Sequence, residues 1–258
     1  TTPSPSEPTA VDVKTVSLNN ATVRLVTQLK SGGRDVTELS NLNVTIRDIK
    51  NGQSGKLDLN GGLSMEMAAQ PDFEGGTLGA KLLGAFTFKL TPDLQPASLQ
   101  GEATATIEKA AGLFAEVANL TAKLACETTP TEIKQAAVQF SKAGTALGEV
   151  RAGGPFALEK LEGKLKVEVL SLDRQVLNLV GAPMGMDFGT TTINSANDVE
   201  LANGGDRIAV IGQFNVARFQ VIQQGQATPT VDLRGDYNVT VDLAGESALL
   251  RTDRTSVV

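Results

Sequence analysis

The feature that most constrains this chain is the period-two alternation of apolar and polar residues in the segment 56–67, KLDLNGGLSMEM. Every odd position from Leu57 to Met67 is Leu, Met or Gly, whereas every even position is Lys, Asp, Asn, Gly, Ser or Glu. Successive side chains of a β-strand point to opposite faces of the sheet, so this segment predicts a strand with one apolar and one polar face. Such strands are typical of antiparallel sheets that expose one face to water.

The same alternation recurs along the whole chain, for example at Phe86, Phe88 and Leu90. We therefore predict an all-β fold that is mainly antiparallel. The predicted strands are 11–18, 20–29, 36–50, 56–68, 81–91, 98–108, 119–128, 132–141, 144–152, 155–170, 186–201, 206–223 and 230–244.

Turn residues separate many of these strands. Asn51-Gly52 and the segment 203–206, Asn-Gly-Gly-Asp, are hairpin signals, because Asn and Gly tolerate the positive φ angles of tight turns. The segment 31–35, SGGRD, predicts a further turn. The apolar phase slips by one residue between Val216 and Phe219, which predicts a β-bulge that re-aims the strand.

Two segments break the period-two pattern. The segment 171–181, SLDRQVLNLVG, places apolar residues at helical spacing, with Ser171 as a candidate N-cap and Gly181 as a stop signal. We predict one short amphipathic helix at about 171–180. The segment 108–118, EKAAGLFAEVA, is compatible with a helical turn or an irregular strand, because Gly112 lies in its middle.

The length of 258 residues is compatible with a single all-β domain that buries a substantial core. The opening TTPSPSEPTA is rich in Pro, Ser and Thr, which is typical of a flexible linker. We predict a linker over 1–10 and one elongated β domain over 11–258. No run of about 18 apolar residues and no signal segment is present. Because the chain begins at Thr1, we expect a processed or excised part of a longer polypeptide.

The residue types for common catalytic chemistry are largely missing. The chain has no histidine, the commonest general base and metal ligand. Cys126 is the only cysteine, which excludes an intramolecular disulfide and a thiolate-rich zinc site. Its phase with Leu124 places it on the apolar face, where we expect it to be a buried small hydrophobe. We predict that the chain is not an enzyme, that it has no catalytic residues, and that it holds no metal and no cofactor.

Charge and aromatic content argue against nucleic acid as a partner. The net charge is −6, with 23 basic residues scattered among 29 acidic ones, and aromatic residues make up 4% of the chain. Three carboxylates, Asp198, Glu200 and Asp206, lie near one hairpin. Acidic residues are expected on the solvated face of an antiparallel sheet, so we predict that changing all three to amides leaves function unchanged.

Three stretches resemble the AsmA-like proteins. Residues 39–63, LSNLNVTIRDIKNGQSGKLDLNGGL, resemble the recurring unit of a strand, a short turn and a G-x-L-x-L-x-G strand. Residues 147–181 are similar to the C-terminal part of that family, in which two strands around L-G and G-P-F lead into a long strand and a short helix. Residues 233–252, LRGDYNVTVDLAGESALLRT, resemble its closing strands.

This resemblance implies an elongated, curled sheet that forms an open, β-taco-like groove. It also implies a periplasmic protein, anchored in the inner membrane of a diderm bacterium through an upstream transmembrane helix that this chain lacks. The implied activity is lipid binding or transport, or outer-membrane biogenesis. The partners that it implies are a phospholipid or another acyl-chain lipid and the membrane itself.

If the sheet stays partly open, its apolar face is a candidate groove for acyl chains, and small residues such as Ala103, Ala105, Ala122 and Ala136 would leave room in it. If two sheets pack face to face, or one sheet closes on itself, the same side chains fill an ordinary core. The alternative function is then a structural or adhesive β-sandwich that interacts through its loops. The hypothetical groove lining is Leu57, Leu59, Leu63, Leu165, Val167, Val169, Val239 and Val241.

Overall fold

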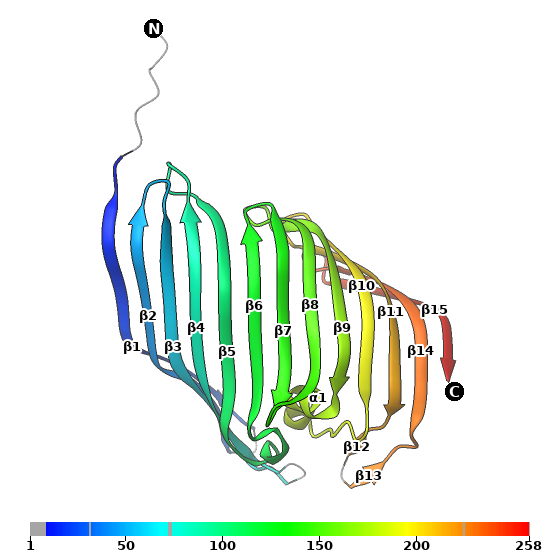
Figure 1. Cartoon of the computed structure of the whole chain (residues 1–258). Coiled ribbons are helices and arrows are strands. Elements are labelled where there is room, and N and C mark those ends of the chain that lie inside the picture. The colour runs from blue at the N-terminus through cyan, green and yellow to red at the C-terminus, as the bar shows by residue number, and fades with distance from the viewer. Residues whose placement is uncertain (1–8, 31, 72–73, 224, 258) are drawn as a thin grey trace.

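A computed structural model describes residues 9–30, 32–71, 74–223 and 225–257. Its main feature is one 13-stranded antiparallel sheet in which each strand pairs with the next along the chain, from β1 at one edge to β15 at the other (Figure 1). Two short strands, β12 and β13, form a separate hairpin between β11 and β14. The predicted all-β, antiparallel fold is confirmed. Most of the predicted linker, residues 1–8, lies outside the described residues.

The strands are long, and one α-helix and two 3-10 helices interrupt their succession. The elements are β1 Asp12–Gln28, β2 Arg34–Lys50, β3 Ser54–Met67, β4 Gly76–Leu90, β5 Pro96–Gly112, η1 Ala115–Val117, β6 Leu120–Thr129, β7 Glu132–Lys142, β8 Thr145–Ala157, β9 Glu162–Asp173, α1 Arg174–Gly181, η2 Ala182–Met184, β10 Thr192–Ala202, β11 Arg207–Phe219, β12 Ile222–Gln223, β13 Gln226–Ala227, β14 Val231–Asp242 and β15 Ser247–Val257.

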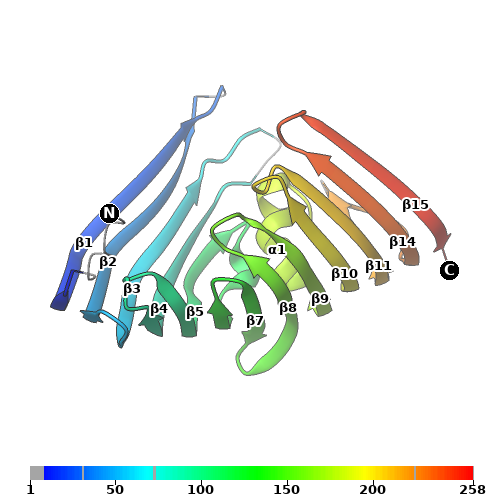
Figure 2. The same ribbon diagram turned by 90° about the horizontal axis from the view of Figure 1, so that it is seen from above.

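The sheet curls about an axis along its strands, so that β1 and β15 flank a concave side that contains α1 (Figure 2). We call the concave surface of the sheet the inner face and the convex surface the outer face. The sheet is not closed, because β1 pairs only with β2 and β15 only with β14 in the described residues. Two sheets packed face to face, as a β-sandwich requires, are not found in this part of the chain.

A compact core lies at one end of the inner face. Val176 of α1 and Phe114 and Val117 of the β5–β6 connection pack there against strand residues. Phe114, Val117 and Leu120 are each at most 2% exposed. The buried members of this core cluster are Leu78, Ile107, Phe114, Val117, Leu120, Leu147 and Val176. The tightest packing is therefore concentrated where the helices meet the sheet.

The helix lies where the sequence predicts it, but its N-cap differs. Asp173, not Ser171, is the N-cap, and its carboxylate accepts a hydrogen bond from the backbone N–H of Gln175 at 2.9 Å. Ser171 adopts a φ of 48° in β9 instead. The α-helix ends at Gly181, as predicted. A 3-10 turn, η2, follows directly and ends at Gly185, whose φ is 71°.

Several strand boundaries also differ from the prediction. β8 runs through the glycines at 153–154 to Ala157, so the hairpin to β9 falls at 158–161. The segment predicted as a strand from 186 begins only at Thr192, because the backbone of Asp187 pairs with Ile222 of β12 instead of joining the main sheet. The final strand, β15, is missing from the prediction. The turns at Asn51-Gly52 and 203–206 and the bulge between Val216 and Phe219 are confirmed.

Leu120 and Leu83 provide a matched test of where the stability resides. Leu120 is 1% exposed in the core cluster, whereas Leu83 is 46% exposed on the outer face. We expect Leu120→Ala to lower the free energy of unfolding by about 2–5 kcal/mol. Leu83→Ala, the control, should change it by only about 0.5 kcal/mol. Urea denaturation measures both, and equal losses would contradict a core confined to the helical end.

Candidate functional site

The strand register assigns the eight residues of the predicted groove lining to the inner face. Met65 of β3 packs against the core cluster, and Leu57, Leu59 and Leu63 share its face because β3 pairs with β4 without a shift. In the C-terminal strands of the sheet, Val199 of β10 pairs with both Leu165 of β9 and Val210 of β11. The residues assigned to this face by the same alternation are Leu165, Val167, Val169, Val239 and Val241.

All eight of these side chains are partly buried and none is fully buried. Exposure increases toward the edges of the sheet, where Leu25 on β1 is 66% exposed and Leu250 on β15 is 63% exposed. Both residues lie on the inner face, because Leu25 pairs with Thr37 and Leu250 with Val239. The inner face is therefore an apolar surface that this chain only partly covers.

The inner face carries no charged side chain at the paired positions of β3 to β11 and β14 between the strand ends. These positions hold Leu, Val, Ile, Phe, Met, Ala, Gly and Cys, apart from the neutral polar residues Thr128, Ser195, Asn197 and Tyr237. Such a surface is suited to hydrocarbon and unsuited to ionic ligands.

Small side chains are interspersed with Leu124, Val138 and Phe140 in the middle of the inner face. Ala103, Ala105, Ala122 and Ala136, which the sequence suggests as space-giving residues, all lie there. Cys126 stands among them, paired with Gly101 on β5 and Ala136 on β7. Toward β3, the ring of Phe88 lies over Gly55, where an added Cβ would come within 2.3 Å of it. Side-chain size therefore varies from position to position on this face.

Cys126 is partly buried rather than fully buried as the sequence predicted. Burial raises the pKa of its thiol, and a hydrogen bond with the backbone of Gly101 opposes that effect less strongly. The thiol is therefore mostly protonated near neutral pH, and it reacts more slowly than a free thiol. It faces the concave side of the sheet, so Cys126 is a natural labelling site on the inner face.

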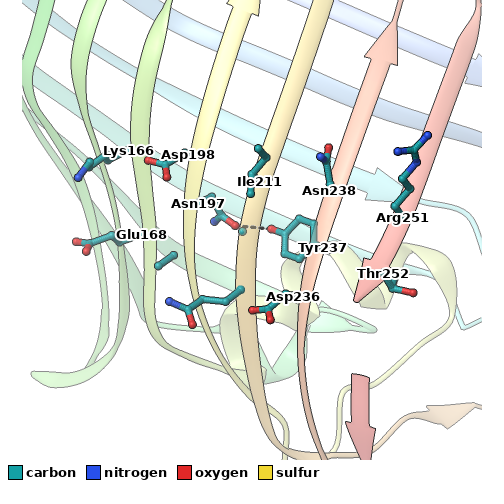
Figure 3. Close-up of a pocket in the computed structure, with 13 residues that line it drawn as sticks. Lys166, Glu168, Asn197, Asp198, Ile211, Asp236, Tyr237, Asn238, Arg251 and Thr252 are labelled. Atoms are coloured by element: carbon teal, nitrogen blue, oxygen red, sulfur yellow. Dashed lines mark hydrogen bonds between the residues drawn. The ribbon is translucent and has the colours of Figure 1, made fainter. Parts of the chain in front are cut away.

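A small polar cluster interrupts the apolar surface between β9 and β14. The hydroxyl of Tyr237 donates a hydrogen bond to Oδ1 of Asn197, two strands away, and passes over Gly212 (Figure 3). The side-chain amide of Asn197 donates to the backbone oxygen of Val167 at 3.2 Å and to Oγ of Ser195 at 3.1 Å. Burial raises the pKa of Tyr237, so its phenol stays neutral.

The sequence pattern does not predict this cluster. The alternation places Tyr237 in the apolar phase with Val239 and Val241, and Asn197 and Ser195 share that phase on β10. The occurrence of polar residues at apolar positions is the sequence signal that could have revealed the cluster. The hydrogen bond between Asn197 and Tyr237 depends on the register between strands, which the residue spacing within one strand does not specify.

The outer face is polar and carries ion pairs within and between strands. Arg151 and Glu149 form a 2.8 Å pair on β8, and Lys123 reaches Glu102 across β5 and β6 at 2.9 Å. The guanidinium of Arg151 lowers the pKa of Glu149 through a hydrogen bond. Exposed pairs of this kind contribute at most about 1 kcal/mol each. The outer face is therefore hydrophilic, whereas the inner face is apolar.

A shallow hollow of about 830 Å³ lies over β9, β10, β11, β14 and β15 (Figure 3). Lys166, Asp198, Ile211, Asn238 and Arg251 pair in one row across these strands, so their side chains belong to the outer face. Its lining combines both signs of charge, and the described residues contain no group of three or more potential metal ligands. The hollow therefore favours no particular class of ligand.

The three carboxylates near the β10–β11 hairpin do not converge on one point. Asp198 pairs with Ile211 and Glu200 with Ala209, both on the outer face, while Asp206 lies in the turn between β10 and β11. Glu200 forms an exposed ion pair with Lys164 at 3.5 Å. These contacts are those of ordinary solvated side chains.

Polar contacts hold α1 at the end of the inner face. Arg174 donates to both carboxylate oxygens of Glu116, at 2.9 and 3.3 Å. Asn178, which is 6% exposed, donates to Asp187 at 2.7 Å and accepts from the backbone N–H of Phe188 at 2.9 Å. The helix is thus tied both to the β5–β6 connection and to the segment that leads into β10.

Comparison of the chain with protein-family models, with curated proteins and with solved structures found no match in any of the three. In the described part of the chain, no helix has the length and apolar character needed to cross a bilayer. The resemblance to AsmA-like proteins therefore stays a prediction. Inferences about function must then rest on the geometry of the inner face.

The pH dependence of Cys126 alkylation tests its position. Only the thiolate reacts with maleimide, and burial raises the pKa of this thiol. We expect the rate in the folded protein to rise with pH through a midpoint above that of the same chain unfolded in urea. A midpoint at or below the unfolded one would contradict the partly buried position.

Proposed function

We propose that this chain is a non-enzymatic module of a cell envelope that binds the acyl chains of lipids on its inner face. The observation that carries the proposal is an extended apolar surface, uncharged between the strand ends and only partly covered by the chain's own side chains. A monomeric protein rarely leaves so large an apolar surface in contact with water unless the surface binds something.

The dimensions of the inner face suit a lipid chain. A strand such as β4 has 15 residues, so at about 3.4 Å per residue it extends roughly 50 Å. The hydrocarbon core of a bilayer is about 30 Å thick, which gives each leaflet about 15 Å of acyl chain. The sheet can therefore accommodate a chain along its strands even though the core cluster occupies one end.

The energetics also favour hydrocarbon. Complete burial of a methylene contributes about 0.8 kcal/mol, and an open face would recover part of that for each methylene that it contacts. An acyl chain with many methylenes can then bind without a specific polar contact. The shortage of aromatic residues, 4% of the chain, makes a sugar or a nucleobase a poorer occupant.

The proposal includes a location. A lipid-binding sheet of this kind fits the periplasm of a diderm bacterium, where lipids must cross an aqueous space between two membranes, and the resemblance to AsmA-like proteins supports it. We further propose that an upstream transmembrane helix anchors the module in the inner membrane and that its ligand is a phospholipid or another acyl-chain lipid.

Protection of Cys126 tests the proposed function directly. The probe is a monomeric short-chain diacyl phosphatidylcholine, kept below its critical micelle concentration. At about ten times its Kd this lipid should slow maleimide labelling of Cys126 about tenfold, because the thiol reacts only in the unoccupied fraction.

The matched control for this experiment moves the thiol to the outer face. In Cys126→Ser combined with Ala85→Cys, the new thiol lies on β4 opposite Asp58 and Glu102, away from the inner face. Lipid should leave its labelling rate unchanged. Equal protection of both thiols, or of neither, would contradict binding on the inner face.

Charge on the inner face should block lipid without unfolding the sheet. Leu59 and Val167 are partly buried, so an Asp at either position can keep its carboxylate hydrated. We expect Leu59→Asp and Val167→Asp to bind no lipid. At least one of them should melt within about 4 °C of the wild type, a shift that corresponds to roughly 1 kcal/mol in a domain of this size.

The control for this pair is Leu83→Asp, which places the same charge on the outer face. It should retain both the melting temperature and lipid binding. Thermal melting and lipid titration measure the three variants. Unfolding of both inner-face variants would indicate a filled core, in which an unpaired buried charge is strongly destabilising.

A further inference from the structure

The cluster of Ser195, Asn197 and Tyr237 has hydrogen-bonding capacity that its internal contacts do not use. Tyr237 donates to Asn197, and Asn197 donates to Ser195 and to the backbone oxygen of Val167. Ser195 Oγ accepts the bond from Asn197, so its own hydrogen remains for another acceptor. None of the described residues receives a hydrogen bond from this hydroxyl.

The glycine between the two strands is required for this cluster. A Cβ added at Gly212 would lie 2.1 Å from Oδ1 of Asn197, so any other residue would displace the amide from the phenol of Tyr237. The ring of Tyr237 also contacts Phe214, with ring centroids 6.1 Å apart and planes inclined by 46°. Glycine and aromatic ring together hold the polar groups in a fixed place on an otherwise apolar face.

The chemistry of the cluster selects among lipid groups. Its three side chains are neutral, and no charged side chain shares the inner face at that level of β9 to β14 in the described residues. A phosphate would therefore lack a counter-charge here. An uncharged acceptor such as an ester carbonyl matches a single hydroxyl donor surrounded by apolar side chains.

We propose that this cluster is an ester-recognition subsite, in which the Ser195 hydroxyl donates a hydrogen bond to the carbonyl oxygen of an acyl ester whose chain lies on the inner face. Asn197 and Tyr237 act as positioning residues, since they orient the hydroxyl of Ser195 and need not contact the lipid. The inference rests on the proposed function, because it assumes that an acyl chain occupies this face.

The chain provides its own probe for this subsite. Tyr237 is the only tyrosine and tryptophan is absent, so tyrosine emission reports on the cluster alone. The experiment titrates the wild type with two short-chain phosphatidylcholines that differ only in ester or ether linkage, following Tyr237 emission and Cys126 labelling together. We expect the ester lipid to bind about threefold to tenfold more tightly, the range of one hydrogen bond.

Variants separate the hydroxyl from the rest of the cluster. Ser195→Ala removes the donor and keeps the fluorophore, and it should bind both lipids with the affinity that the wild type has for the ether lipid. Ser195→Thr keeps a hydroxyl and should restore part of the preference. Ser64→Ala removes an exposed hydroxyl of β3 that pairs with Gly79 on the outer face, and it should behave as the wild type.

The outcomes distinguish the two proposals. Failure of both lipids to protect Cys126 would overturn the proposed function and the subsite with it. Equal affinity for ester and ether lipids, with Cys126 protected, would overturn only the subsite. The subsite would also be overturned if Ser195→Ala kept the ester preference, or if Tyr237 emission stayed constant while Cys126 became protected.

Discussion

The structure depends on one constraint, which is that a single curved sheet has no second layer over most of its apolar face. Hydrophobic burial is the dominant favourable contribution to folding, and here full burial is concentrated in the core cluster around Phe114, Val117 and Leu120. Elsewhere the inner side chains remain partly exposed, and the continuous ladder of strand pairs carries the fold. That arrangement leaves an apolar surface available for a ligand.

Side-chain size is distributed over the inner face in a way that serves this openness. The middle strands contribute the small residues Gly101, Ala122, Cys126 and Ala136 to this face, interspersed with Leu124, Val138 and Phe140. Large residues at all of these positions would fill more of the space above the sheet.

The two faces also divide the electrostatics of the molecule. Ion pairs such as Arg151–Glu149 and Lys123–Glu102 lie on the outer face, which is hydrated. On the inner face, the hydrogen-bonded cluster around Asn197 and Tyr237 is neutral. Its hydrogen bonds form next to apolar side chains, where leaving a polar group without a partner costs more free energy than it does in water. Proposed affinity for acyl chains and proposed selectivity for an ester thus reside on the same surface, in different residues.

The sequence by itself determined the elements and the faces, because alternation, turn residues and helix caps are local signals. It predicted the strand 56–68, the bulge between Val216 and Phe219, the helix that follows β9, and the shared phase of Leu57, Leu59 and Leu63. Only the tertiary structure decided that one sheet stays open instead of two packing together, since period two is identical in both cases. It alone joined Asn197 to Tyr237 across Gly212, and it left Cys126 partly exposed, because such contacts arise from the register and curvature of several strands together.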